Sequence, residues 1–213
     1  MKIGIDIDNI LTYSVPQDYM FGAEFCRMMN RPYQYDPTSP SVKGQFQLTD
    51  SLYDKFMDIY FKRIVNESVC DKEAVRVLKE MHNGGDDLYI ITARMIDYDK
   101  KGCKYSGKQM ANDTIKWFYR NDLSFIPLDH FIFRRNNIRK VDYCKKLGIE
   151  LMIEDNPIHF IPIINNKIHT IVFDYPFNMN YMVDMLIDEN NASYLHYTKT
   201  RWHNINDIIR TLI

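Results

Sequence analysis

Two aspartates end the first apolar stretch of the sequence, and their spacing suits them for chemistry. Apolar side chains alternate from Ile3 to Ile7, and Asp6 and Asp8 stand two residues apart at the end of this run. Because alternate residues of a strand share a face, we expect the two carboxylates to lie close together. Two such groups repel unless a proton, a basic partner or a hard cation relieves them. Taken alone, the pair is equally typical of aspartates that cap a helix or anchor a loop.

Other candidate residues also follow apolar stretches. Thr92 lies in the segment IITAR, and Glu154 and Asp155 end the segment IELMIED. Lys140 begins the helical pattern just before that last segment. A threonine hydroxyl can hold a phosphate oxygen, and a lysine acts on phosphate as a point charge. Mg²⁺ takes one or two carboxylates with phosphate and water, so Asp155 is a further candidate ligand. The ordinary alternatives are a cap for Thr92 and a solvated helix position for Lys140.

The elements that must position these residues alternate between strand and helix. Apolar runs predict five strands, at residues 2–8, 88–93, 129–134, 149–155 and 168–175. Apolar periodicity predicts helices at residues 71–85, 108–121, 139–148 and 204–213, the third ending at Gly148. We therefore predict an α/β fold: a Rossmann-like parallel sheet with helices on both faces. Ligands of such sheets bind beyond the carboxyl ends of the strands, where the candidate residues fall.

Residues 13–70 interrupt this alternation. Two amphipathic segments, 20–30 and 50–65, predict helices, with Asp50 as N-cap of the second, and a Pro- and Ser-bearing stretch joins them. We predict a helical cap at residues 13–70, inserted after the first strand, and a catalytic core of residues 1–12 and 71–213. A cap that leaves the core directly after the first strand must stand at the carboxyl edge of the sheet.

The four groups together resemble the haloacid dehalogenase-like superfamily of phosphohydrolases. Its motifs appear in order as DIDNI, IITAR, Lys140 and IEDN, spread over nearly the whole chain. The resemblance implies that Asp6 is the nucleophile, which forms an aspartyl-phosphate, and that Asp8 is the general acid and then the base. It implies Mg²⁺ held by Asp6, by Asp8 through its backbone carbonyl, and by Asp155. It implies phosphate binding by Thr92 and Lys140.

The residues next to these motifs complete the predicted site. Ala93 and Arg94 follow the motif threonine and are further candidates for phosphate binding, with a structural salt bridge as the alternative for Arg94. The sequence departs from the superfamily pattern at two positions. Ile10 stands where threonine or valine is usual, and Glu154 replaces the usual aspartate or glycine. A direct contact of Glu154 with the metal is left open.

The position of the cap resembles one branch of the superfamily, the 5′(3′)-deoxyribonucleotidases and their bacterial nucleotidase-like relatives. The segments DIDNIL, TAR, ELMIEDNP, DYPFN and RWHNINDII carry this likeness. It implies a Mg²⁺-dependent phosphomonoesterase acting on nucleoside monophosphates. A sugar phosphate or another small metabolite is the alternative substrate, and a catalytically silent binding protein is the alternative class. Four aromatic residues of the cap are candidates either to stack on a base or to pack within the cap: Phe21, Phe25, Tyr33 and Tyr35.

Charge and composition limit the partners. The net charge of −1 argues against nucleic acid and against an anionic membrane surface as partners. No apolar run is long enough to span a bilayer, and the first strand begins at once, so we predict a cytoplasmic protein with reduced cysteines. A small phosphate ester is then the expected partner. Residues 97–108 form a basic loop near the predicted site, and Asn178 is a candidate rim residue. The oligomeric state is not predicted.

Overall fold

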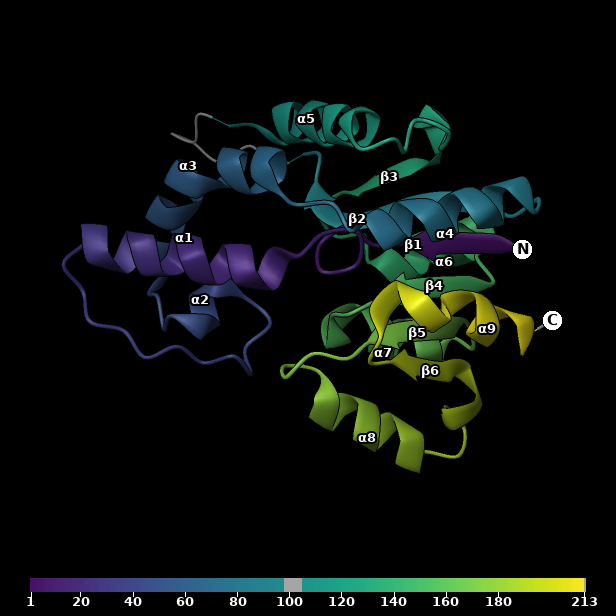
Figure 1. Ribbon diagram of the computed structural model, residues 1–213. Coiled ribbons are helices and arrows are strands. Elements are labelled where there is room, and N and C mark those ends of the chain that lie inside the picture. The colour runs from purple at the N-terminus through teal and green to yellow at the C-terminus, as the bar shows by residue number, and fades with distance from the viewer. Residues whose placement is uncertain (98–104, 213) are drawn as a thin grey trace.

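Six parallel strands form a single sheet in the computed structural model, which describes residues 1–97 and 105–212 (Figure 1). The strands are β1 (Lys2–Ile5), β2 (Asp87–Met95), β3 (Phe131–Arg134), β4 (Leu151–Glu154), β5 (His169–Phe173) and β6 (Leu195–Thr198). Their order is β3-β2-β1-β4-β5-β6, and every neighbouring pair is parallel. This confirms the predicted α/β, Rossmann-like fold. The first strand lies near the middle, so its carboxyl end opens at the centre of the sheet edge.

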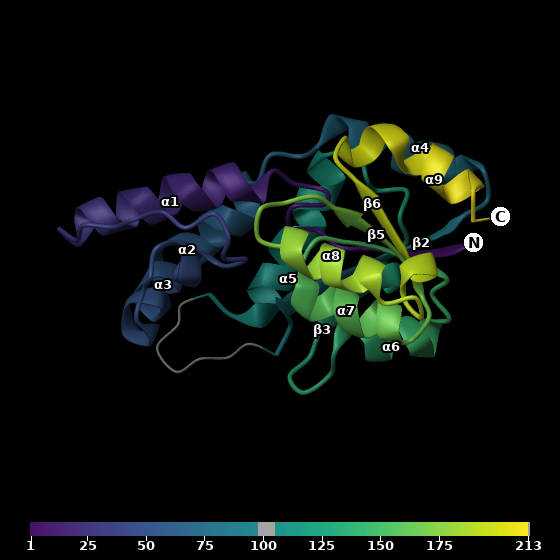
Figure 2. The ribbon, with the colours of Figure 1, turned by 90° about the horizontal axis from the view of Figure 1, so that it is seen from below.

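Helices cover both faces of the sheet. They are α4 (Lys72–Asn83), α5 (Gly107–Arg120), α6 (Lys140–Leu147), α7 (Pro157–Asn165), α8 (Met179–Ile187) and α9 (Ile205–Arg210). Short 3-10 helices occupy Leu128–His130, Ala192–Tyr194 and Arg201–Asn204. Figure 2 shows α4 and α9 on one side of the sheet and α6, α7 and α8 on the other. The predicted helix α6 ends as expected at Gly148, which takes the left-handed conformation at φ 68°.

Alternation along the strands explains the two apolar layers. Leu88 and Ile90 of β2 pack with α4, whereas Tyr89 and Ile91 of the same strand pack with α6. A side chain at Gly4 would meet the second layer, because a Cβ there would lie 2.7 Å from the sulfur of Met152. The sheet is therefore buried on both sides, which is why its strands read as nearly continuous apolar runs.

The segment after β1 forms three helices, whose apolar side chains pack into a cluster of their own. We call residues 13–70 the insertion; it contains α1 (Ser14–Met28), α2 (Val42–Gln45) and α3 (Asp50–Glu67). Figure 1 shows these helices beyond the carboxyl edge of the sheet, at the left. The stems of the insertion are joined, because Thr12 and Cys70 form a β-bridge and the Asp71 N–H donates to the Leu11 carbonyl at 2.9 Å.

Several predicted elements differ from the observed ones for local reasons. Thr49, not Asp50, is the N-cap of α3, since its hydroxyl accepts the N–H of Leu52. The first strand ends at Ile5 rather than residue 8, and the third begins at Phe131 because a 3-10 helix takes the preceding residues. Besides the short 3-10 helices, three α-helices and one strand among the described residues were not predicted: α2, α7, α8 and β6. The helix α2 and the strand β6 have only four residues each, and α7 carries Pro162 in its interior, so these three give no strong pattern.

Two features of the structure bear on the expected compartment: the lengths of the helices and the state of the cysteines. No described helix combines the length and the apolar character that crossing a membrane requires. Cys26, Cys70 and Cys144 are buried free thiols, which agrees with the expectation of reduced cysteines. Cys103 and most of the predicted basic loop fall within residues 98–104, which lie outside the described residues.

Candidate active site

A buried lysine joins two carboxylates at the carboxyl edge of the sheet. Asp6 directly follows β1, and its N–H donates to the Ile153 carbonyl of β4 at 3.1 Å. Lys140 is the first residue of α6, as predicted, and its side chain is inaccessible to solvent. Its Nζ lies 2.7 Å from Asp6 Oδ1 and 2.8 Å from Glu154 Oε1. A lysine is tolerated at such depth only because it is paired on both sides.

Asp155 brings a third carboxylate to the same place. Asp6, Glu154 and Asp155 each offer an oxygen, and the three oxygens lie within 4.8 Å of one another. Glu154 Oε2 accepts the N–H of Asp155 at 2.9 Å, so Glu154 uses both oxygens within the protein. Asp155 Oδ2 accepts a hydrogen bond from the Asn9 amide at 2.9 Å. Glu154 therefore holds Lys140 and the following backbone, whereas Asp6 and Asp155 are the members of this group that line the pocket.

The electrostatics of this cluster suit a hard cation. Burial raises the pKa of Asp6 to about 7; Lys140 lowers it, and the Glu154 and Asp8 carboxylates raise it. Burial and the Glu154 and Asp6 charges also raise the pKa of Asp155 well above its usual value. Asp6 Oδ1 is buried and accepts no well-aligned hydrogen bond, although Lys140 is close. Crowded carboxylate oxygens of this kind fit Mg²⁺, which prefers oxygen ligands.

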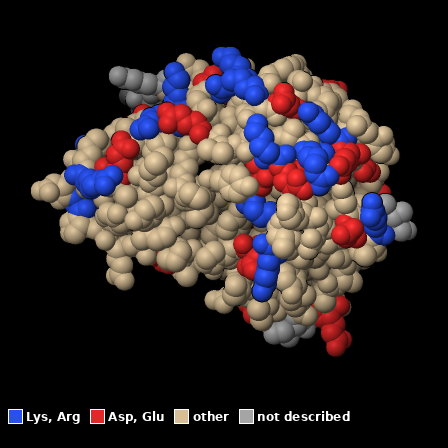
Figure 3. Space-filling view, in the orientation of Figure 1, with Lys and Arg blue, Asp and Glu red and all other residues tan. Residues whose placement is uncertain are grey.

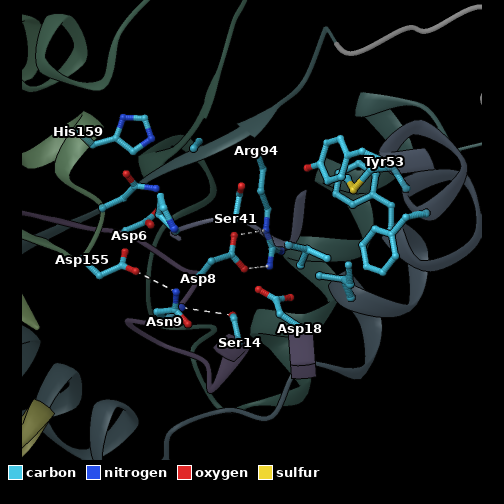
Figure 4. A pocket seen from close by; sticks show the side chains of 18 residues that line it. Asp6, Asp8, Asn9, Ser14, Asp18, Ser41, Tyr53, Arg94, Asp155 and His159 are labelled. Atoms are coloured by element: carbon cyan, nitrogen blue, oxygen red, sulfur yellow. Dashed lines mark hydrogen bonds and ion pairs between the residues drawn. The ribbon is translucent and has the colours of Figure 1, made fainter. Parts of the chain in front are cut away.

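Asp8 lies apart from this cluster and is paired with Arg94. Arg94 Nε donates to Asp8 Oδ2 at 3.1 Å and Nη2 donates to Oδ1 at 2.7 Å (Figure 4). Arg94 is itself fixed by a hydrogen bond from Nη1 to Thr114 Oγ1 at 2.9 Å. β1 ends at Ile5, so Asp6 and Asp8 both follow the strand rather than belong to it, yet both line the same pocket. The two carboxylates have different partners at the same sheet edge.

The predicted phosphate-binding residues of β2 divide into two groups. The side chain of Thr92 is buried, and its hydroxyl accepts the N–H of Arg94 at 3.2 Å. Thr92 is not among the residues that line the pocket, whereas Ala93 and Arg94 are. The structure therefore places Thr92 behind the surface that a ligand would touch.

The pocket between the core and the insertion has a volume of about 310 Å³. Its core side includes Asp6, Asp8 and Asp155. Its insertion side is mainly α3, which contributes the side chains of Tyr53, Phe56, Met57, Phe61 and Ile64. Of the four aromatic residues singled out in the sequence, Phe21 and Phe25 have no exposed surface and pack within the insertion. Tyr33 and Tyr35 do not line the pocket either, so its aromatic wall comes from α3.

Three polar residues of the pocket that were not predicted from the sequence bear on its chemistry. Asn9 adopts a left-handed backbone at φ 61°, which turns its amide towards Asp155. His159 lies in the first turn of α7, where burial and the nearby Lys140 lower its pKa to about 3. Asp18 reaches the pocket from α1. The Asn-Pro pair before α7 is a capping signal that could have placed His159, but no local pattern distinguishes Asp18.

Asn178 was expected at the rim of the site, but its side chain is buried in the protein and does not line the pocket. Its side chain is fully buried, and its amide donates to the carbonyls of Asp155 at 2.7 Å and Phe173 at 2.8 Å. The rim expectation is therefore wrong. Asn178 braces the ends of β4 and β5, and it holds the backbone of a candidate metal ligand.

The loop after Asp8 is fixed by residues far along the chain. The Asn9 carbonyl accepts hydrogen bonds from Tyr175 Oη at 2.9 Å and from Arg201 Nη1 at 3.0 Å. The Ile10 carbonyl accepts from Arg201 Nη2 at 3.0 Å and from Trp202 Nε1 at 2.9 Å. Arg201 also pairs with Asp71 at the second stem of the insertion, at 3.0 Å. Arg201 therefore ties the loop after Asp8 to the second stem of the insertion.

Comparison with known proteins supports the fold through structure rather than through sequence. No protein-family model and no curated protein matches the chain. A haloacid dehalogenase-like hydrolase from Streptococcus pneumoniae is 12% identical with a TM-score of 0.65, covering 100% of this chain and 98% of its own. A protein from Clostridium acetobutylicum, predicted to be a phosphatase, is 13% identical with a TM-score of 0.64 and 98% coverage of both chains.

A protein from Thermotoga maritima, proposed to be a beta-phosphoglucomutase, is 14% identical with a TM-score of 0.61. It covers 100% of this chain and 99% of its own. At such identities the likeness shows the fold alone, an α/β fold that this chain shares with these solved structures.

Proposed function

We propose that the protein is a Mg²⁺-dependent phosphomonoesterase that works through an aspartyl-phosphate intermediate. The observation that carries this proposal is the buried group of Asp6, Lys140 and Asp155, of which Asp6 and Asp155 line a pocket at the carboxyl edge of the sheet. Two further observations support it: the fold shared with hydrolases and the paired Asp8 and Arg94 across the pocket. Asp6 and Asp155 would hold the cation, with the Asp8 carbonyl as a third ligand. Bound there, Mg²⁺ would reduce the repulsion between a carboxylate and a phosphate dianion.

Each proposed step uses a residue of this chain. An Asp6 oxygen attacks phosphorus, the bond to the leaving oxygen breaks, and Asp8 gives its proton to that oxygen. Water then attacks the phosphorus of the aspartyl-phosphate, Asp8 accepts a proton from it, and Asp6 leaves as a carboxylate. Lys140 holds Asp6 in place and offsets its charge at a distance of 2.7 Å. Ala93 and Arg94 lie where phosphate oxygens would bind, and Thr92 supports them from behind.

The pairing of Asp8 implies a rearrangement during the reaction. Both of its carboxylate oxygens accept hydrogen bonds from Arg94, an arrangement that leaves no proton to give. Asp8 can act as an acid only after this pair has opened and the carboxylate has been protonated. An incoming phosphate is a competing anion for the guanidinium, so substrate binding itself supplies a reason for the pair to open.

A nucleoside monophosphate is the proposed substrate, with the insertion at residues 13–70 acting as the cap that selects it. The aromatic and apolar wall from α3 supports this choice, because a flat base buries well against Tyr53 and Phe61. A sugar phosphate is the second candidate, favoured by the structural likeness to a protein proposed to be a beta-phosphoglucomutase.

Small partners and a cytoplasmic location remain part of the proposal. On the face of the described residues shown in Figure 3, basic and acidic side chains are interspersed, so this face offers no extended basic surface for nucleic acid. A small phosphate ester therefore remains the proposed partner.

Release of inorganic phosphate from an aryl phosphate tests the proposed chemistry. Activity should appear with Mg²⁺, stop with EDTA, and fall at least about a thousandfold in Asp6→Asn, because the variant lacks the nucleophile. Asp174→Asn is the matched control, since it removes a carboxylate at the end of β5, outside the pocket. Undiminished activity of purified Asp6→Asn would overturn the mechanism.

A substrate panel tests the specificity separately. The nucleoside 5′-monophosphates should give a higher kcat/KM than hexose and pentose phosphates if α3 binds a base. A preference for the sugar phosphates would instead support the second candidate and leave the chemistry intact.

A further inference from the structure

A carboxylate of the insertion faces the pocket without a partner in the protein. Asp18 lies half-buried on α1, and among the described residues no hydrogen bond or ion pair reaches its carboxylate. Figure 4 shows this carboxylate beside Asp8 and Arg94, on the insertion side of the same space. Because the side chain is half-buried, solvent in the pocket can reach it, and a bound ligand could take the place of that solvent as its hydrogen-bond partner.

The polar neighbours of Asp18 are already engaged with one another. Arg94 donates to both oxygens of Asp8, and Ser14 Oγ is 2.6 Å from Thr12 Oγ1 while it also accepts the N–H of Asn9. None of these groups has to turn to Asp18 to satisfy its own hydrogen bonding. A ligand that fills the pocket would therefore meet a carboxyl group that no described residue engages.

The surroundings of Asp18 specify what kind of partner fits. Burial, together with the charge of Asp8, raises the pKa of Asp18 to about 8, so near neutral pH the group is mainly an uncharged carboxyl that both donates and accepts. A hydroxyl matches this group better than an ammonium, which needs an ionised partner. The wall formed by Tyr53, Met57 and Phe61 lines the same pocket and suits a flat apolar group.

We propose that Asp18 binds a free hydroxyl on the leaving-group part of the substrate and so selects ribonucleoside monophosphates over their deoxygenated counterparts. This inference rests on the proposed function, since it takes the phosphate to lie at Asp6. The substrate then spans the pocket: the phosphate at the sheet edge, the sugar hydroxyl at α1 and the base at α3. Asp18 becomes a specificity residue that no motif of the core would reveal.

Calorimetric binding to the Mg²⁺-loaded Asp6→Asn protein tests this without turnover. The probes are the four common ribonucleoside 5′-monophosphates and their 2′,3′-dideoxy counterparts. We expect at least one ribonucleotide to bind about 10-fold more tightly than its dideoxy form, the range of one hydrogen bond. Adding Asp18→Ala should reduce that ratio to within about twofold. Adding Asp58→Ala, which makes the same substitution at an exposed position of α3, should preserve it.

The outcomes separate this inference from the proposed function. Equal binding of both forms, a ratio that survives Asp18→Ala, or no binding of any nucleotide overturns the role of Asp18. Hydrolysis of an aryl phosphate by the wild-type protein reports on the chemistry alone, because such a substrate carries no hydroxyl for Asp18 to bind. Aryl phosphatase activity of the wild-type protein, together with a binding ratio that is lost on Asp18→Ala and kept on Asp58→Ala, supports both proposals.

Discussion

Replacing Lys140 by methionine should destabilise the protein strongly. Methionine keeps the length of the aliphatic chain but removes the charge that lies 2.7 Å from Asp6 and 2.8 Å from Glu154, in a place without solvent. Breaking a buried ion pair from one side costs about 3–5 kcal/mol. Most of this cost should come from Glu154, because Asp6 can take up a proton: its pKa is about 7 even beside the lysine. We therefore expect a loss of about 3–5 kcal/mol at pH 7.5 and a smaller loss at pH 5.5, which is further below the pKa of Asp6, so that this carboxyl binds its proton more fully.

Urea denaturation in EDTA measures this loss, with Lys145→Met as the matched control. Lys145 lies on the same helix but is exposed, so its replacement should change the free energy of unfolding by less than about 0.5 kcal/mol. In the double variant Lys140→Met/Glu154→Gln, the glutamine amide can replace the lost donor while its oxygen still accepts the Asp155 N–H. The loss of unfolding free energy in the double variant should be about 1–3 kcal/mol smaller than the sum of the losses in the two single variants. A loss below about 1 kcal/mol for Lys140→Met, or strictly additive losses, would refute the reasoning.

Three further predictions concern the insertion. Phe56→Ala should cost about 3–5 kcal/mol of unfolding free energy, because Phe56 has no exposed surface in the apolar cluster of the insertion. Urea denaturation measures this loss, and a cost below about 1 kcal/mol would contradict the prediction. Thr49→Ala should lower the free energy of unfolding by about 1 kcal/mol, because it removes the N-cap of α3, and Asp50→Ala should lower it clearly less. The reverse order of the two losses would show that Asp50 is the cap. The folded protein raises the pKa of Asp18 to about 8, so ionisation of the unfolded chain reduces stability progressively from about pH 4 to pH 8. Asp18→Asn should therefore stabilise the protein more at pH 8 than at pH 5, and equal differences in melting temperature at the two values would contradict the shift.

The core of the fold was predictable because its signals are local and repeated. The helix from Lys140 to Gly148 has both its apolar face and its left-handed C-cap in the sequence, and it appears as predicted. The strands before Asp6 and Asp155 are apolar runs that end in charge, so their convergence at one edge follows from the parallel sheet alone. The order of strands and helices along the chain is therefore enough to bring Lys140, Glu154 and Asp155 to one place.

The rest of the pocket depends on how the insertion packs, and no periodicity encodes this. The helices α1 and α3 both carry aromatic residues, but only the packing decides that Phe21 and Phe25 turn inwards whereas Tyr53 lines the pocket. A salt bridge was one of the two alternatives that the sequence left open for Arg94, and only the three-dimensional structure shows that its partner is Asp8. The two residues are 86 positions apart in the sequence, so no local pattern pairs them.

The anchor at Arg201 and Trp202 has a consequence for how the site forms during folding. These two residues hold the carbonyls of Asn9, Ile10 and Thr12 across separations of 189 to 192 positions in sequence. During synthesis the loop beside Asp8 therefore exists long before the residues that hold it have been made. Closing so long a segment is entropically costly and slow compared with local contacts. The loop that presents Asn9 to Asp155 should be among the last parts to become rigid, so the ability to bind Mg²⁺ would appear after most of the sheet has formed.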